Sequence, residues 1–378
     1  MSAPVLGTFI LKVANRCNID CDYCYVFHSV DESWRSKPDR ISPEVIDASA
    51  RRIGEYAEAH QVATVSVIFH GGEPLLLGRP AFERMVARLR DRIGAGTTVC
   101  FQVQTNGTLL DERWIDLFHG AGVRVGISLD GPPRANDRHR RTNQGRSTFQ
   151  AALDGIHAVE RREGLFSGVL AVVDIRNDSA EVYDLLASLR PPVIDFNLPH
   201  ANHQQSPLRR DVGRPEYGIW LSAVFDRWAS ASTEAPRIRM FEDIAALSLG
   251  ATNSVESLGL GSPGLVVIES DGSIESVDTL RTTEPGASVL GLRVFDNSMD
   301  EVATHPKVAT RALGTRVLAA QCRTCDLVEV CGGGYLPHRF KIGSGYRNPS
   351  VYCDDLSYLI RHIQAAIRPW QGDTPESK

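Results

Sequence analysis

The chain has 378 residues, of which 42% are hydrophobic and 23% are charged, so it has room for one large domain and a smaller one. Its formal charge of −5 argues against a nucleic acid as partner, because phosphate backbones are usually bound by a basic face. No apolar stretch is long enough to span a membrane, and the first residues lack the regions of a signal peptide. We therefore expect a cytoplasmic protein that binds neither membrane nor nucleic acid.

Short apolar runs rich in β-branched residues recur along the first half of the chain, each followed by a helical pattern. This composition is typical of strands buried in a parallel sheet. The expected strands are Thr8–Val13, Thr64–Phe69, Val99–Gln104, Val123–Ser128, Ser167–Val173 and Val193–Leu198. The expected helices are Pro43–Ala59, Ala81–Arg92, Glu112–Gly120, Ser147–Glu163, Ala180–Arg190 and Tyr217–Ala229. Repeated βα units predict either an open doubly wound sheet or a partial barrel.

The pattern changes after residue 236, which we take as the end of a core barrel domain that spans residues 1–236. Residues 237–264 are expected to form a helical bridge. Residues 265–362 are expected to form a second, cysteine-rich module, which begins with a hairpin made by Leu265–Ile268 and Ser273–Leu280. The last residues, 363–378, are expected to be a C-terminal tail.

Three cysteines follow the first expected strand, at Cys17, Cys21 and Cys24, with Tyr25 directly after the third. Thiolates are the usual ligands of a cubane iron–sulfur cluster, and three of them leave one of the four irons without a protein ligand. Chemistry can occur at that iron. A zinc loop is the alternative, but zinc usually takes four ligands and no fourth follows here. We therefore predict a [4Fe–4S] cluster on these cysteines.

This cysteine motif resembles that of the radical SAM superfamily, whose members cleave S-adenosylmethionine at the open iron to make a 5′-deoxyadenosyl radical. After the second expected strand, Gly71-Gly72-Glu73-Pro74 resembles the superfamily's GGEP motif, which receives the methionine amino group of the cofactor. Glycines allow a close backbone approach, and Glu73 offers a carboxylate to an ammonium. The alternative is a simple strand-to-helix turn. Because such motifs follow several strands at equivalent positions, they favour the barrel.

Further polar residues at the strand ends resemble cofactor contacts of the same superfamily. The resemblance assigns them as follows: Thr105 and Asn106 face the ribose, Ser128 and Asp130 contact ribose or substrate, Arg140 pairs with the cofactor's carboxylate, and Tyr25 flanks the adenine. Each has an ordinary alternative, namely a turn, a solvated basic loop or simple packing. We assign no catalytic role to the histidines, because a single histidine is more often structural.

Four later cysteines form a second set: Cys322, Cys325, Cys331 and Cys353. Four thiolates fill a cubane cluster, although a four-cysteine zinc site is a serious alternative. Their spacing resembles the outer auxiliary cluster of the SPASM extension found behind radical SAM barrels. Maturases with two auxiliary clusters have further cysteines where this chain has Val277 and Tyr335. The resemblance therefore implies one auxiliary [4Fe–4S] cluster and no inner one.

Asp278 follows Val277 and keeps an aspartate of that pattern. In sulfatase maturases this aspartate serves as a base near the substrate, so the resemblance makes Asp278 a candidate general base. An ordinary hairpin aspartate is the alternative.

Taken together, the motifs resemble radical SAM/SPASM peptide maturases of the FxsB/GrrM type, since Asp271–Asp278 followed by Leu280 has the look of that subgroup. The resemblance implies an α/β fold, namely a partial (β/α)6 TIM-type barrel with a C-terminal cysteine-rich SPASM/twitch-like module. It also implies hydrogen abstraction from a ribosomally synthesised precursor peptide, leading to an oxidative side-chain cross-link of the cyclophane type. A flavodoxin or ferredoxin would supply the electron. We expect no separate leader-binding domain ahead of the first strand.

Two alternatives to this function stay open. One is an anaerobic sulfatase maturase that oxidises Ser or Cys to formylglycine, against which the missing inner cluster argues. The other is a non-catalytic iron–sulfur or zinc binding protein, against which the intact Cys17/Cys21/Cys24 set and Glu73 argue.

Overall fold

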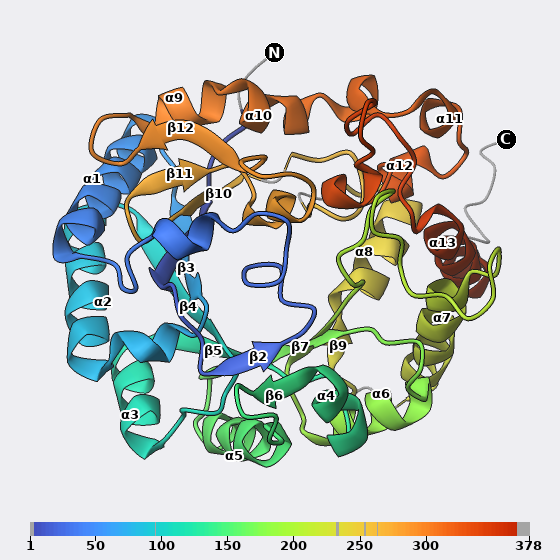
Figure 1. The fold of residues 1–378 in the computed structure, drawn as a ribbon, viewed down its shortest axis with the longest axis horizontal. Helices are drawn as coiled ribbons and strands as arrows, with labels where there is room; N and C mark the ends of the chain where they lie inside the picture. The colour runs from blue at the N-terminus through green and yellow to red at the C-terminus, as the bar shows by residue number, and fades with distance from the viewer. Residues whose placement is uncertain (1–3, 95, 232–233, 253–254, 263, 369–378) are drawn as a thin grey trace, which may run out of the picture.

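A single curved sheet organises the molecule (Figure 1). The computed structural model describes residues 4–94, 96–231, 234–252, 255–262 and 264–368. The sheet has ten strands in the order β12-β11-β10-β1-β3-β4-β5-β7-β8-β9. Their bounds are β1 Thr8–Ala14, β3 Thr64–Gly71, β4 Thr98–Thr105, β5 Val123–Ser128, β7 Phe166–Val172, β8 Val193–Asn197, β9 Arg237–Ile238, β10 Leu265–Ile268, β11 Ser273–Glu275 and β12 Val289–Arg293. The order does not return to its start, so the barrel is partial.

The expected βα units are confirmed, with every predicted strand and helix present within three residues of its predicted ends. The helices that cover the outside of the sheet are α1 Pro43–Ala59, α2 Arg79–Ile93, α3 Glu112–Ala121, α5 Phe149–Glu160, α6 Ser179–Ser188 and α7 Glu216–Ala229 (Figure 1). Helix α1 begins where the sequence indicates, because the Ser42 side chain accepts a hydrogen bond from the Val45 amide and Pro43 occupies the first helical position.

An aromatic cluster fixes β3 and β4 against the helices behind them. Phe69 stacks on Phe101 at 5.7 Å between ring centroids, and Phe82 of α2 meets the edge of Phe69 at 4.9 Å. All three side chains are buried. Burial of a phenylalanine side chain stabilises a fold by about 1.5–3 kcal/mol, so the carboxyl ends of these strands are held on a rigid support.

The second half of the chain continues the same sheet. Strand β10 pairs in parallel with β1, with Thr8 opposite Leu265 and Leu11 opposite Ile268. The predicted hairpin is present as β10 and β11, but its second strand ends at Glu275 and not at Leu280, because a short 3-10 helix begins at Asp278. The expected boundary at residue 265 therefore separates strands that are hydrogen-bonded neighbours. In the expected bridge, α8 spans Arg239–Ser248.

Short helices dominate the remaining residues. They are α9 Met299–Thr304, α10 Pro306–Ala309, α11 Ala320–Arg323 and α12 Val328–Cys331, followed by the longer α13 Cys353–Ile367. Helix α13 packs beside α7 and α8 (Figure 1). The expected tail at 363–378 thus begins inside α13, because its apolar face, which includes Ile363, is buried. Residues 369–378 lie outside the described residues.

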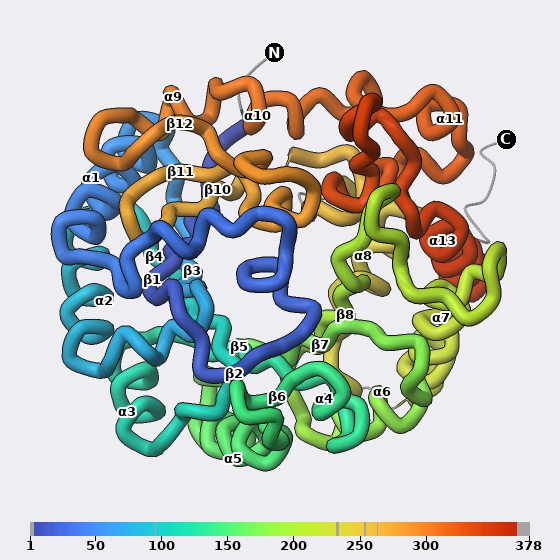
Figure 2. Tube along the Cα trace, in the orientation of Figure 1, coloured from blue at the N-terminus to red at the C-terminus, as the bar shows by residue number. Residues whose placement is uncertain are grey.

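A small antiparallel pair of strands, which the sequence pattern does not predict, lies at the mouth of the barrel. It joins β2 (Ile19–Cys21) to β6 (Arg140–Thr142), which directly follows α4 (Pro133–His139), and places Cys21 opposite Arg140. Figure 2 shows that the chain crosses the centre of the ring in this view after it leaves β2. In the part of the chain that the structure describes, no helix is both long and apolar enough to cross a membrane.

Candidate active site

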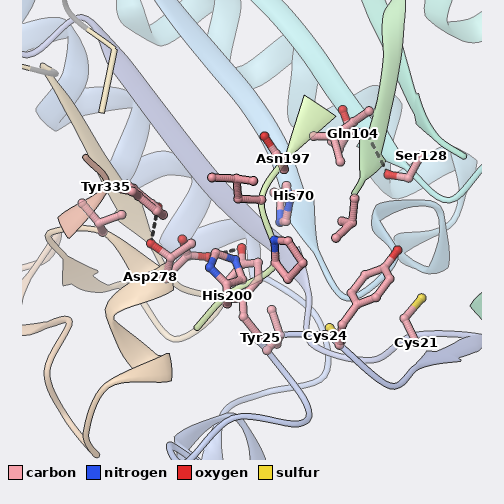
Figure 3. Close-up of a pocket in the computed structure, with 18 of the residues that line it drawn as sticks. Cys21, Cys24, Tyr25, His70, Gln104, Ser128, Asn197, His200, Asp278 and Tyr335 are labelled. Carbon is pink, nitrogen blue, oxygen red and sulfur yellow. Dashed lines mark hydrogen bonds between the residues drawn. The ribbon is translucent and has the colours of Figure 1, made fainter. Parts of the chain in front are cut away.

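A pocket of about 450 Å³ opens at the carboxyl ends of the parallel strands (Figure 3). This volume lies in the range of small-molecule sites. The expected site residues that line it are Cys17, Cys21, Cys24, Tyr25, Gly71, Gly72, Thr105, Asn106, Ser128, Arg140 and Asp278. The expected residues outside its lining are Glu73, Pro74, Asp130, Cys322, Cys325, Cys331 and Cys353. Groups from β1 to β8 and from the cysteine-rich module thus meet in one cavity.

The two glycines after β3 hold the cysteine loop. The amide of Gly72 donates to the carbonyl of Ala14 at 2.8 Å, and the amide of Glu73 donates to the carbonyl of Arg16 at 2.8 Å. A Cβ atom at Gly71 would lie 2.1 Å from the Ala14 oxygen, and one at Gly72 would lie 2.2 Å from the Arg16 oxygen. Only glycine allows this approach. The motif therefore tethers the loop that carries the three cysteines.

The Glu73 carboxylate points into the protein. It is fully buried and accepts hydrogen bonds from the Leu75 amide at 3.0 Å, the Thr105 hydroxyl at 2.7 Å and the Asn106 amide at 2.9 Å. Burial raises the pKa of Glu73, and these donors oppose the rise. Pro74, also buried, opens the short helix η2 (Pro74–Leu77) next to it. Glu73 thus links the end of β3 to the end of β4.

Of the three N-terminal cysteines, Cys21 is buried and Cys17 and Cys24 are partly buried. Burial raises the pKa of Cys17 to about 11 and that of Cys21 to about 12. Asn106 donates from Nδ2 to the Cys17 sulfur at 3.8 Å. Thiols that are protonated when free lose their protons on binding iron, so cluster binding is coupled to proton release. Three thiols at the floor of a pocket, with no fourth cysteine among its lining residues, fit a cubane with one open iron.

A hydrogen-bonded chain positions Arg140. Its guanidinium donates to the Tyr23 hydroxyl at 2.9 Å, and this hydroxyl donates to the Asp130 carboxylate at 2.7 Å. Residues 138–141 contain three arginines, and Arg140 is the one among them that lines the pocket. Arg138 pairs with Asp174 at 3.1 Å, and Arg141 donates to backbone carbonyls. Asp130 is thus placed behind Arg140 as its support. Nearby, Ser128 accepts from Gln104 at 2.9 Å (Figure 3).

Asp278 lies in a buried polar cluster on the opposite wall (Figure 3). Its Oδ2 atom forms an ion pair with Lys12 of β1 and accepts a hydrogen bond from the Tyr25 hydroxyl at 2.7 Å. Burial alone would raise the pKa of Asp278, but the Lys12 ammonium holds it well below its usual range. The carboxylate is therefore ionised at neutral pH.

His70 completes this cluster. Its Nδ1 atom lies 3.1 Å from Lys12 Nζ, and burial lowers the pKa of His70 to about 3. Since an ammonium only donates, the neutral ring must accept at Nδ1 and carry its proton on Nε2. His200 and His338 also line the pocket, and burial lowers the pKa of His200 to about 4 and that of His338 to about 3. These rings are uncharged acceptors or donors.

The second cysteine set gathers at the ends of short helices. Cys322 lies in α11, Cys331 ends α12 and Cys353 begins α13. Cys325 lies in the segment between α11 and α12. The pKa of Cys331 is raised to about 12 by burial first and then by the negative charges of the other three thiolates. Among the described residues, no three His, Cys, Asp or Glu side chains converge to hold a single metal ion. A cubane instead needs thiolates that surround four irons, which suits these four.

Val277 and Tyr335 stand where maturases with two auxiliary clusters have further cysteines. Both line the pocket, and the Tyr335 hydroxyl is hydrogen-bonded to Thr279 (Figure 3). Glu256, another lining residue, pairs with Arg311 at 2.7 Å. Apolar, aromatic and ion-paired side chains thus line the pocket at these positions.

Two contributors to the site are missing from the sequence-based set. Lys12 interrupts the apolar run of β1 and is only 3% exposed, so a charged residue inside a buried strand was an available signal. Tyr23 bridges Asp130 and Arg140, but a tyrosine between two cysteines carries no distinctive pattern.

Residues 11–186 match the family model described as "Radical SAM superfamily". The serine-type anaerobic sulfatase-maturating enzyme of Klebsiella aerogenes is 27% identical over 98% of this chain and 88% of its own length. The cysteine-type enzyme of Clostridium perfringens (strain 13 / Type A) is 27% identical over 88% of this chain and 89% of its own length. A solved structure described as native anSMEcpe with bound AdoMet and Cp18Cys peptide superposes with a TM-score of 0.81 at 21% identity, covering 97% of this chain and 99% of that one.

These matches overturn the main functional prediction. A maturase that cross-links side chains in a precursor peptide is not supported, because the two relatives named above are a serine-type and a cysteine-type anaerobic sulfatase-maturating enzyme. The error came from the weight given to Val277 and Tyr335. Loss of two cysteines alters one wall of the pocket, whereas the cysteine loop and Asp278 remain on its other walls. The finer assignment to the FxsB/GrrM type is not confirmed.

Proposed function

Because residues 11–186 form a radical SAM domain and the chain is therefore a radical SAM enzyme, we propose that it oxidises a Ser or Cys side chain in a peptide substrate to formylglycine. The observation that carries this proposal is the ionised Asp278 carboxylate, which lies in the same pocket as Cys17, Cys21 and Cys24. Similarity to both serine-type and cysteine-type maturases along most of the chain supports it.

We assign different lining residues of the pocket to the cofactor and to the substrate. Cys17, Cys21 and Cys24 would hold the [4Fe–4S] cluster. The cofactor S-adenosylmethionine would be held by the groups beside them, which are Tyr25, Gly71, Gly72, Thr105, Asn106, Ser128 and Arg140. When bound, the cluster and S-adenosylmethionine would together supply a 5′-deoxyadenosyl radical that removes a hydrogen atom from Cβ of the substrate residue.

Asp278 would take the proton that the substrate hydroxyl or thiol loses as the carbon becomes an aldehyde or thioaldehyde. Lys12 keeps this acceptor ionised before substrate arrives, and Tyr25 fixes its orientation. The substrate then has to lose one further electron. Cys322, Cys325, Cys331 and Cys353 would hold the auxiliary [4Fe–4S] cluster that can accept it. A thioaldehyde would exchange its sulfur for oxygen by hydrolysis.

The proposal is tested by anaerobic incubation with S-adenosylmethionine, a reductant and the Cp18Cys and Kp18Cys peptides that are bound in matched structures, together with their serine counterparts. We expect an aldehyde that reacts with a hydrazide probe, detected by mass spectrometry. Cys17→Ala should abolish 5′-deoxyadenosine formation. Asp278→Asn should leave that step in place and reduce aldehyde at least tenfold. Peptide that loses two hydrogens without forming an aldehyde would contradict the proposal.

Three finer expectations belong with this proposal. The electron for cofactor cleavage would come from a flavodoxin or ferredoxin, and the reaction would take place in the cytoplasm. Membership of the FxsB/GrrM subgroup stays a prediction from the sequence of Asp271–Asp278.

A further inference from the structure

Arg339 is a buried arginine for which the described residues provide no carboxylate partner. It ends the short helix η6 (Leu336–Arg339), is only 6% exposed, and its Nε atom has no hydrogen-bond partner within the described residues. In that part of the chain its guanidinium also forms no ion pair. Arg281, which is buried to a similar degree, pairs with Glu269 at 2.8 Å and Glu275 at 2.6 Å. Burial of an uncompensated charge is strongly unfavourable, so Arg339 requires a negative partner.

The guanidinium lies against the turn that follows Cys331. A Cβ atom at Gly333 would meet Arg339 Nη1 at 3.1 Å and Leu318 Cδ2 at 2.8 Å. Leu318 in turn packs with Cys322 in one small apolar cluster. Arg339 thus lies against a turn two residues after Cys331, and the same turn approaches the Leu318 side chain that packs with Cys322. Burial lowers the pKa of Arg339, and the negative charges of ionised Cys322 and Cys331 oppose part of this lowering.

An auxiliary cluster on these cysteines would supply the missing charge. Four thiolates outweigh the positive charge of a cubane core, so the assembly is anionic, and reduction adds one more negative charge. A fixed cation nearby stabilises the reduced form more than the oxidised form. Hydrogen bonds to the sulfur atoms act in the same direction.

We propose that Arg339 is the charge partner of the auxiliary cluster and raises its reduction potential. This inference rests on the auxiliary cluster named in the proposed function, and it deepens that function by assigning a positioning residue for electron acceptance. Arg339 then makes the cluster a better acceptor for the electron that leaves the substrate.

The test measures the midpoint potential of the auxiliary cluster alone. The background is the full chain with Cys17→Ala, Cys21→Ala and Cys24→Ala, reconstituted with iron and sulfide and titrated under EPR detection. In this background Arg339→Gln should shift the midpoint potential to a more negative value. Arg339→Lys keeps the positive charge, so its midpoint potential should lie close to that of the chain with Arg339. Arg323 provides the matched control, because it neighbours Cys322 in sequence but is exposed. Arg323→Gln should leave the potential nearly unchanged, since solvent screens an exposed charge.

Several results would overturn the proposal. They are an unchanged potential in an Arg339→Gln variant that still binds four irons, an equal shift in Arg323→Gln, or a shift that depends on phosphate in the buffer. The last would identify a free anion in the adjoining cavity, which Arg339 also lines, as the charge partner. The proposal would also be wrong if the chain without the three N-terminal cysteines bound zinc in place of iron, because the second cysteine set would then hold no iron–sulfur cluster. The aldehyde assay is independent of this measurement. If the enzyme makes formylglycine but Arg339→Gln leaves the midpoint potential of the auxiliary cluster unchanged, only the inference about Arg339 is wrong.

Discussion

Replacement of Glu73 by glutamine separates two roles for the glutamate of the GGEP motif. The resemblance assigns its carboxylate to the amino group of the cofactor. In the structure the carboxylate is fully buried, is absent from the pocket lining, and accepts hydrogen bonds from Leu75, Thr105 and Asn106. We therefore expect Glu73→Gln to act first on stability and only indirectly on cofactor binding.

The magnitude follows from these three contacts. Glutamine is isosteric but replaces one acceptor oxygen by an NH2 group, which faces either the Asn106 amide or the Leu75 amide. The Thr105 hydroxyl can rotate, whereas a backbone amide cannot. A hydrogen bond to a charged group contributes about 1.5–3 kcal/mol, and a buried donor without an acceptor costs about 1–3 kcal/mol. Removal of a buried charge offsets part of this loss. We expect a net decrease of about 2–4 kcal/mol in the free energy of unfolding.

Urea unfolding of the anaerobic holoenzyme measures this change, with cofactor affinity determined separately by calorimetry. The midpoint should fall while the slope with urea stays constant. Glu83→Gln, at an exposed position of α2, is the matched control and should change the midpoint little. An unchanged midpoint combined with a large loss of S-adenosylmethionine affinity would refute the reasoning and place Glu73 on the cofactor.

Three further substitutions test the neighbouring contacts. Gly72→Ala would place a Cβ atom 2.2 Å from the Arg16 oxygen, so we expect a displaced cysteine loop and a several-fold lower iron content per chain, measured by a colorimetric iron assay. Lys12→Met leaves Asp278 as an unpaired buried charge, and we expect a loss of about 3–5 kcal/mol in urea unfolding, which Asp278→Asn in the same chain should partly restore. The pKa of Asp278 is lowered on folding, so its stabilisation is complete above its unfolded pKa of about 3.9 and is lost as the pH falls through the lower folded value. The stability difference between wild type and Asp278→Asn should accordingly stay constant above about pH 5 and shrink in acid, as followed by urea unfolding at each pH.

Local sequence patterns predicted the barrel because the apolar pattern of each βα unit lies within a short segment of the chain. Strand Val123–Ser128 and helix Pro43–Ala59 lie where the apolar runs and the Ser42 cap place them. The cysteine motif is also local, since its three thiolates lie within one loop. Periodicity and spacing suffice for features of this kind.

Long-range partners could not be read in the same way. Strand β2 has three residues, one of them the exposed Asp20, so no apolar run marks it. The direction of the Glu73 side chain is equally hidden, because a carboxylate after two glycines has the same sequence whether it faces a cofactor or a backbone amide. Lys12 was visible as a charge in a buried strand, but its partner Asp278 is far away along the chain.

The continuous sheet explains why the cysteine-rich module belongs to the active site. Asp278 begins the short helix η3 (Asp278–Thr282) just after β11, which pairs with β10, and β10 pairs with β1. Strand β1 carries Lys12 and leads directly into the cysteine loop. Because side chains alternate along a strand, a register slip of one residue between β1 and β10 would turn the inward-facing set of β10 outward and displace the hairpin that carries Asp278. The position of Asp278 relative to the loop that carries Cys17 is therefore set by two ladders of backbone hydrogen bonds and by the buried ion pair between Asp278 and Lys12, and a loose contact between two domains would not fix it to this degree.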